Sequence, residues 1–139
     1  MKKTACVDLD GTLIRFDEWR GVEYFGDPLP GAKEFLSKLR EKFDVVIYTC
    51  RCTEGIDGPE KASLLRNRVR DELDRLGFEY DHIWIGQGKP IASVYIDDKG
   101  MRCDPAADNL AYQRILYALG FREDGSGVGG VDDANNMVD

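Results

Sequence analysis

The chain has 139 residues and a formal net charge of −7, with 42% hydrophobic and 32% charged residues. This length is typical of one compact domain that buries its own core, and the negative charge disfavours non-specific binding to nucleic acid or to anionic lipid. No apolar run approaches the length of a membrane span, and the apolar stretch near the N-terminus already ends at Asp8. We therefore expect a cytoplasmic protein without a membrane partner.

The predicted elements alternate between strands and helices along the chain. Apolar runs predict strands over residues 4–9, 44–48, 82–85 and 93–96, and helical periodicity predicts helices over residues 31–43, 59–76 and 104–119, the last capped by Asp104. This alternation predicts an α/β fold, a Rossmann-like parallel sheet flanked by helices on both faces. In such sheets ligands bind at the carboxyl ends of the strands, near the point where the strand order reverses.

Two stretches show no periodicity. Residues 11–30 are rich in aromatic side chains, which either pack beneath a long loop or form a flap over a site; they are Phe16, Trp19, Tyr24 and Phe25. Residues 121–139 alternate glycine with small and acidic residues, which predicts a flexible tail beyond a domain of residues 1–120.

The cysteines and the single histidine do not predict a metal centre. A chain of this length folds without disulfides, and zinc sites usually need four ligands in spaced pairs, so we expect free thiols at Cys6, Cys50, Cys52 and Cys103. His82 opens a short apolar run, which favours a position at the surface or at a strand edge.

Polar residues follow every predicted strand. In chain order they are Asp8 and Asp10, then Thr49 and Arg51, then Lys89, and finally Asp97 and Asp98. Carboxylates that converge without a counter-ion repel one another, and a hard divalent cation relieves this repulsion. Magnesium prefers oxygen ligands and is often shared with a phosphate, so the pattern predicts a site for Mg²⁺ and a phosphorylated substrate.

Each polar position has a chemical interpretation at such a site. Thr49, Lys89 and the backbone amides around Gly11 could hold a phosphate. Asp8 could attack phosphorus and form an aspartyl-phosphate. Asp10 could protonate the leaving oxygen and then deprotonate the water that hydrolyses the intermediate.

Arg51 is open to two interpretations. It either contacts the phosphate of the substrate or forms a salt bridge with Glu54 or Asp98.

Four motifs in this order resemble those of the haloacid dehalogenase superfamily, in particular its phosphatase branch. Asp8 to Leu13 match the first motif, Asp-x-Asp-Gly-Thr-Leu, and the apolar run ending at Thr49 matches the second. Lys89 matches the third motif, and the acidic pair after residues 94–96 matches the fourth. About twenty residues separate the first motif from the next helix and about forty separate the second from the third, which leaves no room for a cap domain.

The resemblance implies roles for these residues. Asp8 would be the nucleophile and a magnesium ligand, and Asp10 the acid/base that binds magnesium through its backbone carbonyl. Asp98 would bind magnesium directly, with Asp97 orienting Lys89 or a metal-bound water. It also implies that the first strand is central and lies beside the fourth. The acidic residue that often follows the fourth motif is replaced here by Arg102 and Cys103.

The predicted function is therefore a magnesium-dependent phosphomonoesterase that acts through an aspartyl-phosphate on a substrate of unknown class. The alternative is a non-catalytic metal- and phosphate-binding regulatory module of the same fold. A phospho-accepting receiver domain fits poorly, because its acidic pair comes early in the chain. Without a cap, the site is open or is closed by the aromatic stretch or by a second subunit of a homo-oligomer.

Overall fold

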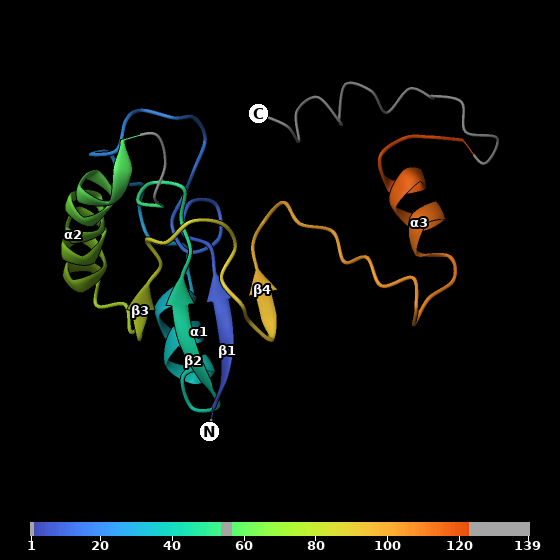
Figure 1. Cartoon of the computed structure of the whole chain (residues 1–139), viewed down its shortest axis with the longest axis horizontal. Helices are drawn as coiled ribbons and strands as arrows, with labels where there is room; N and C mark the ends of the chain where they lie inside the picture. The colour runs from blue at the N-terminus through green and yellow to red at the C-terminus, as the bar shows by residue number, and fades with distance from the viewer. Residues whose placement is uncertain (1, 54–56, 123–139) are drawn as a thin grey trace. The chain divides into compact units, whose positions relative to one another are not determined.

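A computed structural model describes residues 2–53 and 57–122 and divides into two compact units, residues 1–98 and 99–139 (Figure 1). The predicted domain of residues 1–120 spans both units. Residues 123–139 of the predicted tail, and Glu54, lie outside the described residues. Among the described residues, no helix is both long and apolar enough to cross a membrane.

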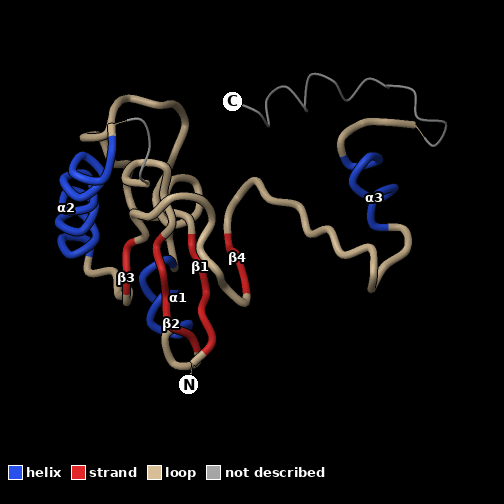
Figure 2. The backbone as a smooth tube through the Cα atoms, in the orientation of Figure 1, coloured by secondary structure: helices blue, strands red, loops and turns tan. Residues whose placement is uncertain are grey.

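The first unit contains a four-stranded sheet in which all strands are parallel, as the sequence predicts (Figure 2). The spatial order is β3-β2-β1-β4, with β1 pairing with both β2 and β4. The strand order therefore reverses at β1, and the carboxyl edge beside β1 and β4 is where a ligand is expected. The strands are β1 (Lys3–Val7), β2 (Phe43–Ile47), β3 (His82–Ile83) and β4 (Val94–Ile96).

Two helices of the first unit bury side chains in one apolar cluster. Leu36 of the first helix and Leu73 of the second belong to the same buried cluster as Val7 and Ile47, which are register partners on β1 and β2. Because side chains alternate between the faces of a sheet, both helices lie against the same face. Helices on both faces therefore remain a prediction. The two helices are α1 (Ala32–Leu39) and α2 (Gly58–Leu76).

The ends of α2 follow the sequence closely. Pro59 stands in its first turn, where its missing N–H costs no helical hydrogen bond, and Gly77 ends it with φ of 74°. The helix α1 ends at Leu39, whereas the sequence predicts an end at residue 43. The chain then turns through Arg40 directly into β2.

An arginine–aspartate pair joins the end of α1 to the amino ends of β2 and β3. Arg40 donates from NH2 and Nε to the two oxygens of Asp81 at 2.8 and 3.3 Å, and the same carboxylate accepts the Val45 N–H at 2.7 Å. The hydrogen bonds from Arg40, together with that from Val45, lower the pKa of Asp81 from its ordinary value.

The second unit contains α3 (Ala111–Ala118). The prediction that this helix starts at Asp104 is wrong, because the carbonyl of Asp104 accepts the N–H groups of Ala107 and Asp108 in a separate turn. Asp108 then accepts the Leu110 N–H at 3.0 Å and delays the helix further. Aspartate side chains compete with helical hydrogen bonds in this way.

Candidate active site at the carboxyl ends of the strands

Three neighbouring strands end together at the carboxyl edge of the sheet. Asp8 follows β1 directly, and its N–H donates to the carbonyl of Ile96 at 2.9 Å, one residue before Asp97. Thr49 lies two residues beyond the end of β2, which is in register with β1. The first, second and fourth motifs therefore meet at the point where the strand order reverses.

A tight turn brings Asp98 against the first motif. Gly11 has φ of 84°, a conformation that residues with a side chain rarely adopt. A Cβ atom at this position would overlap the carboxylate of Asp98. Gly11 is thus needed both for the turn and for the close approach of Asp98.

The backbone amides of this turn are already engaged. Gly11 donates to the carbonyl of Ile14 at 2.8 Å, and Thr12 donates to the carbonyl of Leu9 at 3.2 Å. These two amides therefore stabilise the turn instead of pointing toward a phosphate, which differs from the predicted cradle. The physical reason is that a turn this tight closes its own backbone hydrogen bonds.

Asp8 is half-buried and surrounded by carboxylates. Its pKa is raised to about 6, mainly by burial and also by the negative charges of Asp98, Asp10 and Asp97, although a hydrogen bond from the Leu9 amide lowers it. The three other carboxylates that the sequence predicts at this edge therefore do act on Asp8.

Arg51 forms a bidentate salt bridge with Asp10. Its Nε and NH2 atoms lie 2.8 and 2.9 Å from the two carboxylate oxygens, and the side chains of Arg51 and Asp10 are only 3% and 14% exposed. The predicted salt-bridge partners were Asp98 and Glu54, and Glu54 lies outside the described residues; the partner that the structure gives is Asp10. The adjacent ends of β1 and β2 could have suggested this pair, because they bring the second motif beside the first.

The guanidinium of Arg51 also holds the aromatic stretch. NH1 donates to the carbonyls of Val22 and Gly21 at 3.0 and 3.5 Å, and NH2 donates to the carbonyl of Tyr24 at 2.7 Å. Together with the two bonds to Asp10, all five N–H donors are engaged. This arrangement does not fit the predicted phosphate contact by Arg51.

Aromatic rings flank the same guanidinium. The carbon Cζ of Arg51 lies 4.3 Å from the ring centroid of Phe25 and 5.1 Å from that of Trp19. Phe25 packs against the core, whereas Trp19 and Tyr24 are about half exposed. Phe25 therefore has the first of the two expected roles, core packing, and a flap over the site stays a prediction.

Thr49 and Lys89 differ in placement. Thr49 is buried, and its hydroxyl accepts the backbone N–H of Arg51 at 3.3 Å. The ammonium of Lys89 lies 3.8 Å from the ring centroid of Tyr95 on β4. The predicted contact of Lys89 with the phosphate stays a prediction.

The motifs assign a small set of these residues to a magnesium ion. Within residues 2–53 and 57–122, no group of three or more His, Cys, Asp or Glu side chains is arranged to hold a metal. The set implied by the motifs needs only two carboxylates, those of Asp8 and Asp98, and the carbonyl of Asp10. Asp98 abuts the turn that follows Asp10 and acts on Asp8. Since Mg²⁺ keeps several waters, these residues could hold it, with Asp97 beside them.

The four cysteines do not add to the site. All of them are free thiols, as predicted. In the tripeptide 50–52, Cys50 is exposed and Cys52 is buried, so the two do not form a clip.

Comparison with protein-family models and with curated proteins found no match to this chain. The fold and the site thus define a class: a mixed α/β protein with a four-stranded parallel sheet, three described helices and an acidic cluster at the carboxyl edge.

Proposed function

We propose that this protein is a capless phosphomonoesterase of the haloacid dehalogenase type, dependent on magnesium and acting through an aspartyl-phosphate on Asp8. The observation that carries the proposal is the joint placement of Asp8, Asp10 and Asp98 at one sheet edge, with Asp10 held in a buried bidentate pair. A site that only binds metal and phosphate has little use for a second carboxylate fixed in this way.

The first half of the reaction transfers the phosphoryl group to the protein. A carboxylate oxygen of Asp8 attacks phosphorus, and the bond from phosphorus to the ester oxygen breaks. Asp10 gives its proton to the departing oxygen, so the leaving group departs as an alcohol. Thr49 can donate its hydroxyl to a phosphoryl oxygen. Magnesium, when bound, would neutralise negative charge on the phosphoryl group.

The second half returns the protein to its starting state. Asp10 removes a proton from water, the water oxygen attacks phosphorus, and the bond between Asp8 and phosphorus breaks to release inorganic phosphate. Arg51 touches neither phosphorus nor water in this scheme, so it is a positioning residue.

The first experiment is hydrolysis of a broad panel of phosphate esters, with and without Mg²⁺. Wild type should release phosphate only with magnesium, and Asp8→Asn should release none. Asp71→Asn, which changes an exposed aspartate on α2, is the matched control and should keep full activity. Activity that survives in Asp8→Asn contradicts the nucleophile. Binding of Mg²⁺ without turnover of any ester favours the regulatory-module alternative.

The role of Asp10 has its own test. With p-nitrophenyl phosphate, whose leaving group needs no proton, Asp10→Asn should release one equivalent of nitrophenol per protein in a burst and then turn over slowly. The reason is that only the second step then requires Asp10. Mg²⁺ binding should persist because the carbonyl of residue 10 is unchanged. A variant without a burst, or one that no longer binds Mg²⁺, contradicts these assignments.

A further inference from the structure

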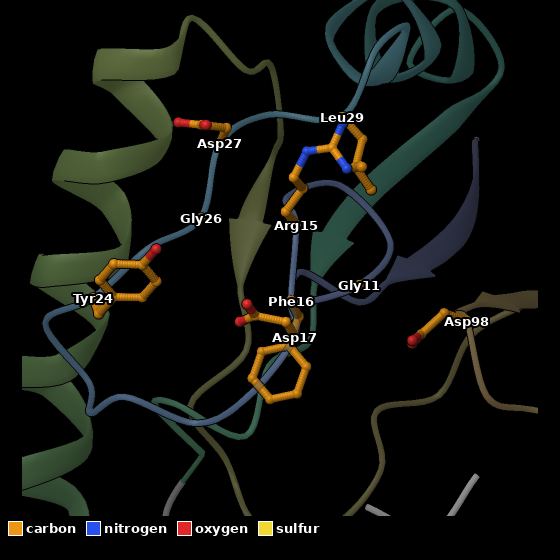
Figure 3. Close-up of a pocket in the computed structure, with 9 residues that line it drawn as sticks. All are labelled: Gly11, Arg15, Phe16, Asp17, Tyr24, Gly26, Asp27, Leu29 and Asp98. Atoms are coloured by element: carbon orange, nitrogen blue, oxygen red, sulfur yellow. The ribbon is translucent and has the colours of Figure 1, made fainter. Parts of the chain in front are cut away.

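A pocket of about 450 Å³ opens beside the site, between the Gly11 turn and the aromatic stretch (Figure 3). It is lined by Gly11 and Asp98, and by Phe16 and Tyr24 of the aromatic stretch. A group attached to a phosphate at Asp8 would therefore have this space next to it. A volume of this size accommodates a compact organic group.

The backbone beneath the pocket is fixed by antiparallel pairing. Leu29 donates to the carbonyl of Leu13 at 2.9 Å, and Arg15 donates to the carbonyl of Asp27 at 2.8 Å. A side chain at Gly26 would overlap the carbonyl of Arg15, so the two segments approach as closely as glycine allows. The pocket is thus a built feature and not a gap under an unattached loop.

Tyr24 is held at both ends. Its backbone carbonyl accepts from NH2 of Arg51 at 2.7 Å, and its hydroxyl accepts from NH1 of Arg20 at 3.0 Å. Arg20 in turn pairs with Asp17 at 2.9 Å. The ring of Tyr24 is therefore positioned before any ligand arrives, which lowers the entropic cost of binding against it.

We infer that this pocket receives the leaving group of the phosphate ester and selects a flat aromatic group. The inference rests on the proposed function and names its substrate class. The preference for an aromatic group follows from the rings of Phe16 and Tyr24, which favour stacked or edge-on contact with another ring.

The test compares benzyl phosphate with cyclohexylmethyl phosphate. The two esters have rings of similar size and leave as alcohols of similar basicity, so they differ mainly in aromatic character. Wild type should show a KM for benzyl phosphate that is lower by about threefold to tenfold, the factor expected from an aromatic contact. Equal KM values for the two esters would overturn the inference that the pocket selects an aromatic group.

Variants assign the preference to the pocket. Tyr24→Leu and Phe16→Leu should each reduce the preference for benzyl phosphate over cyclohexylmethyl phosphate toward one. Tyr117→Leu, which changes a largely exposed ring on α3, is the matched control and should keep the preference. A preference that survives in both pocket variants places the selection elsewhere and contradicts the inference.

Binding is measured separately from turnover. Calorimetry with benzylphosphonate and cyclohexylmethylphosphonate, which cannot be hydrolysed, reports binding to the Mg²⁺-loaded protein without turnover. If benzylphosphonate binds selectively but no ester is hydrolysed, the proposed function is contradicted and the selectivity of the pocket is supported. If esters are hydrolysed without selectivity in either assay, the selectivity of the pocket is contradicted and the proposed function is supported.

Discussion

Two arginine–aspartate pairs stand at opposite ends of the sheet, and their surroundings differ. Arg51 and Asp10 meet at the carboxyl ends of the strands, with side chains 3% and 14% exposed. Arg40 and Asp81 meet at the amino ends, with side chains 37% and 23% exposed. Both pairs are bidentate, so the difference between them lies in burial and not in geometry.

Burial changes what each pair does. In a buried pair each charge has lost its contact with water and is stabilised by its partner, so loss of one partner leaves the other charge uncompensated. The Arg51 pair also holds three backbone carbonyls of the aromatic stretch, and it therefore couples the first motif to the pocket wall. The Arg40 pair is screened by solvent and closes the amino end of the sheet. The more buried pair thus lies where we propose the chemistry.

The largest effect is expected from Asp8→Asn, which should lower phosphate release on the order of a thousandfold or more. The same change should raise the free energy of unfolding of the metal-free protein at pH 7.5 by about 2 kcal/mol, because the folded state raises the pKa of Asp8 to about 6 and so disfavours its charge. This gain should shrink as pH falls from 6 toward 4, where the wild-type carboxyl is protonated when folded. Urea unfolding at several pH values with chelator measures it, and no gain at pH 7.5 would contradict the crowding of charge.

Arg51→Ala should have the next-largest effect. It leaves the carboxylate of Asp10 buried and unpaired, and we expect a loss of about 3 to 5 kcal/mol in the free energy of unfolding. Arg51→Lys keeps the charge but not the planar fork, so it should recover part of the stability and little of the turnover. Urea unfolding and kcat are the measurements. A lysine variant with wild-type kcat and an unchanged pH profile would show that positioning of Asp10 does not matter.

Gly11→Ala should have an intermediate effect. The positive φ costs about 1 to 2 kcal/mol for a residue with a Cβ atom, and the new methyl group displaces Asp98. Gly21→Ala is the matched control, since Gly21 has φ of 100° and open space where its Cβ would lie. Both variants should lose similar stability, but only Gly11→Ala should weaken Mg²⁺ binding. Equal Mg²⁺ affinity in the two variants would contradict the placement of Asp98.

Asp81→Asn should have the smallest effect, about 1 kcal/mol in the free energy of unfolding with kcat unchanged. Because the pKa of Asp81 is lowered in the folded state, its contribution is fully present above the unfolded pKa near 3.8 and is lost as pH falls through the folded value. Wild type and variant should therefore differ in stability at pH 6 and converge below pH 3. A change in kcat would show that the two ends of the sheet are coupled.

Much of the framework could be predicted from local sequence. The apolar runs before Asp8 and Thr49 form the paired strands β1 and β2, and Pro59 and Gly77 mark the ends of α2. These features depend on hydrophobic periodicity and on backbone restrictions of proline and glycine, which act within a few residues. The predicted start of α3 was wrong because Asp104 and Asp108 form other local hydrogen bonds before the helix begins.

The sequence was therefore enough to predict that polar residues such as Asp8 and Asp10 follow the ends of parallel strands. Which of these residues contact one another depends on the tertiary structure. Long side chains such as those of Arg51 and Lys89 reach several partners, and strand order and burial select among them: Asp10 and three loop carbonyls for the first, the ring of Tyr95 for the second. The pocket beside Gly11 likewise depends on pairing between residues 13–15 and 27–29, which no local pattern encodes.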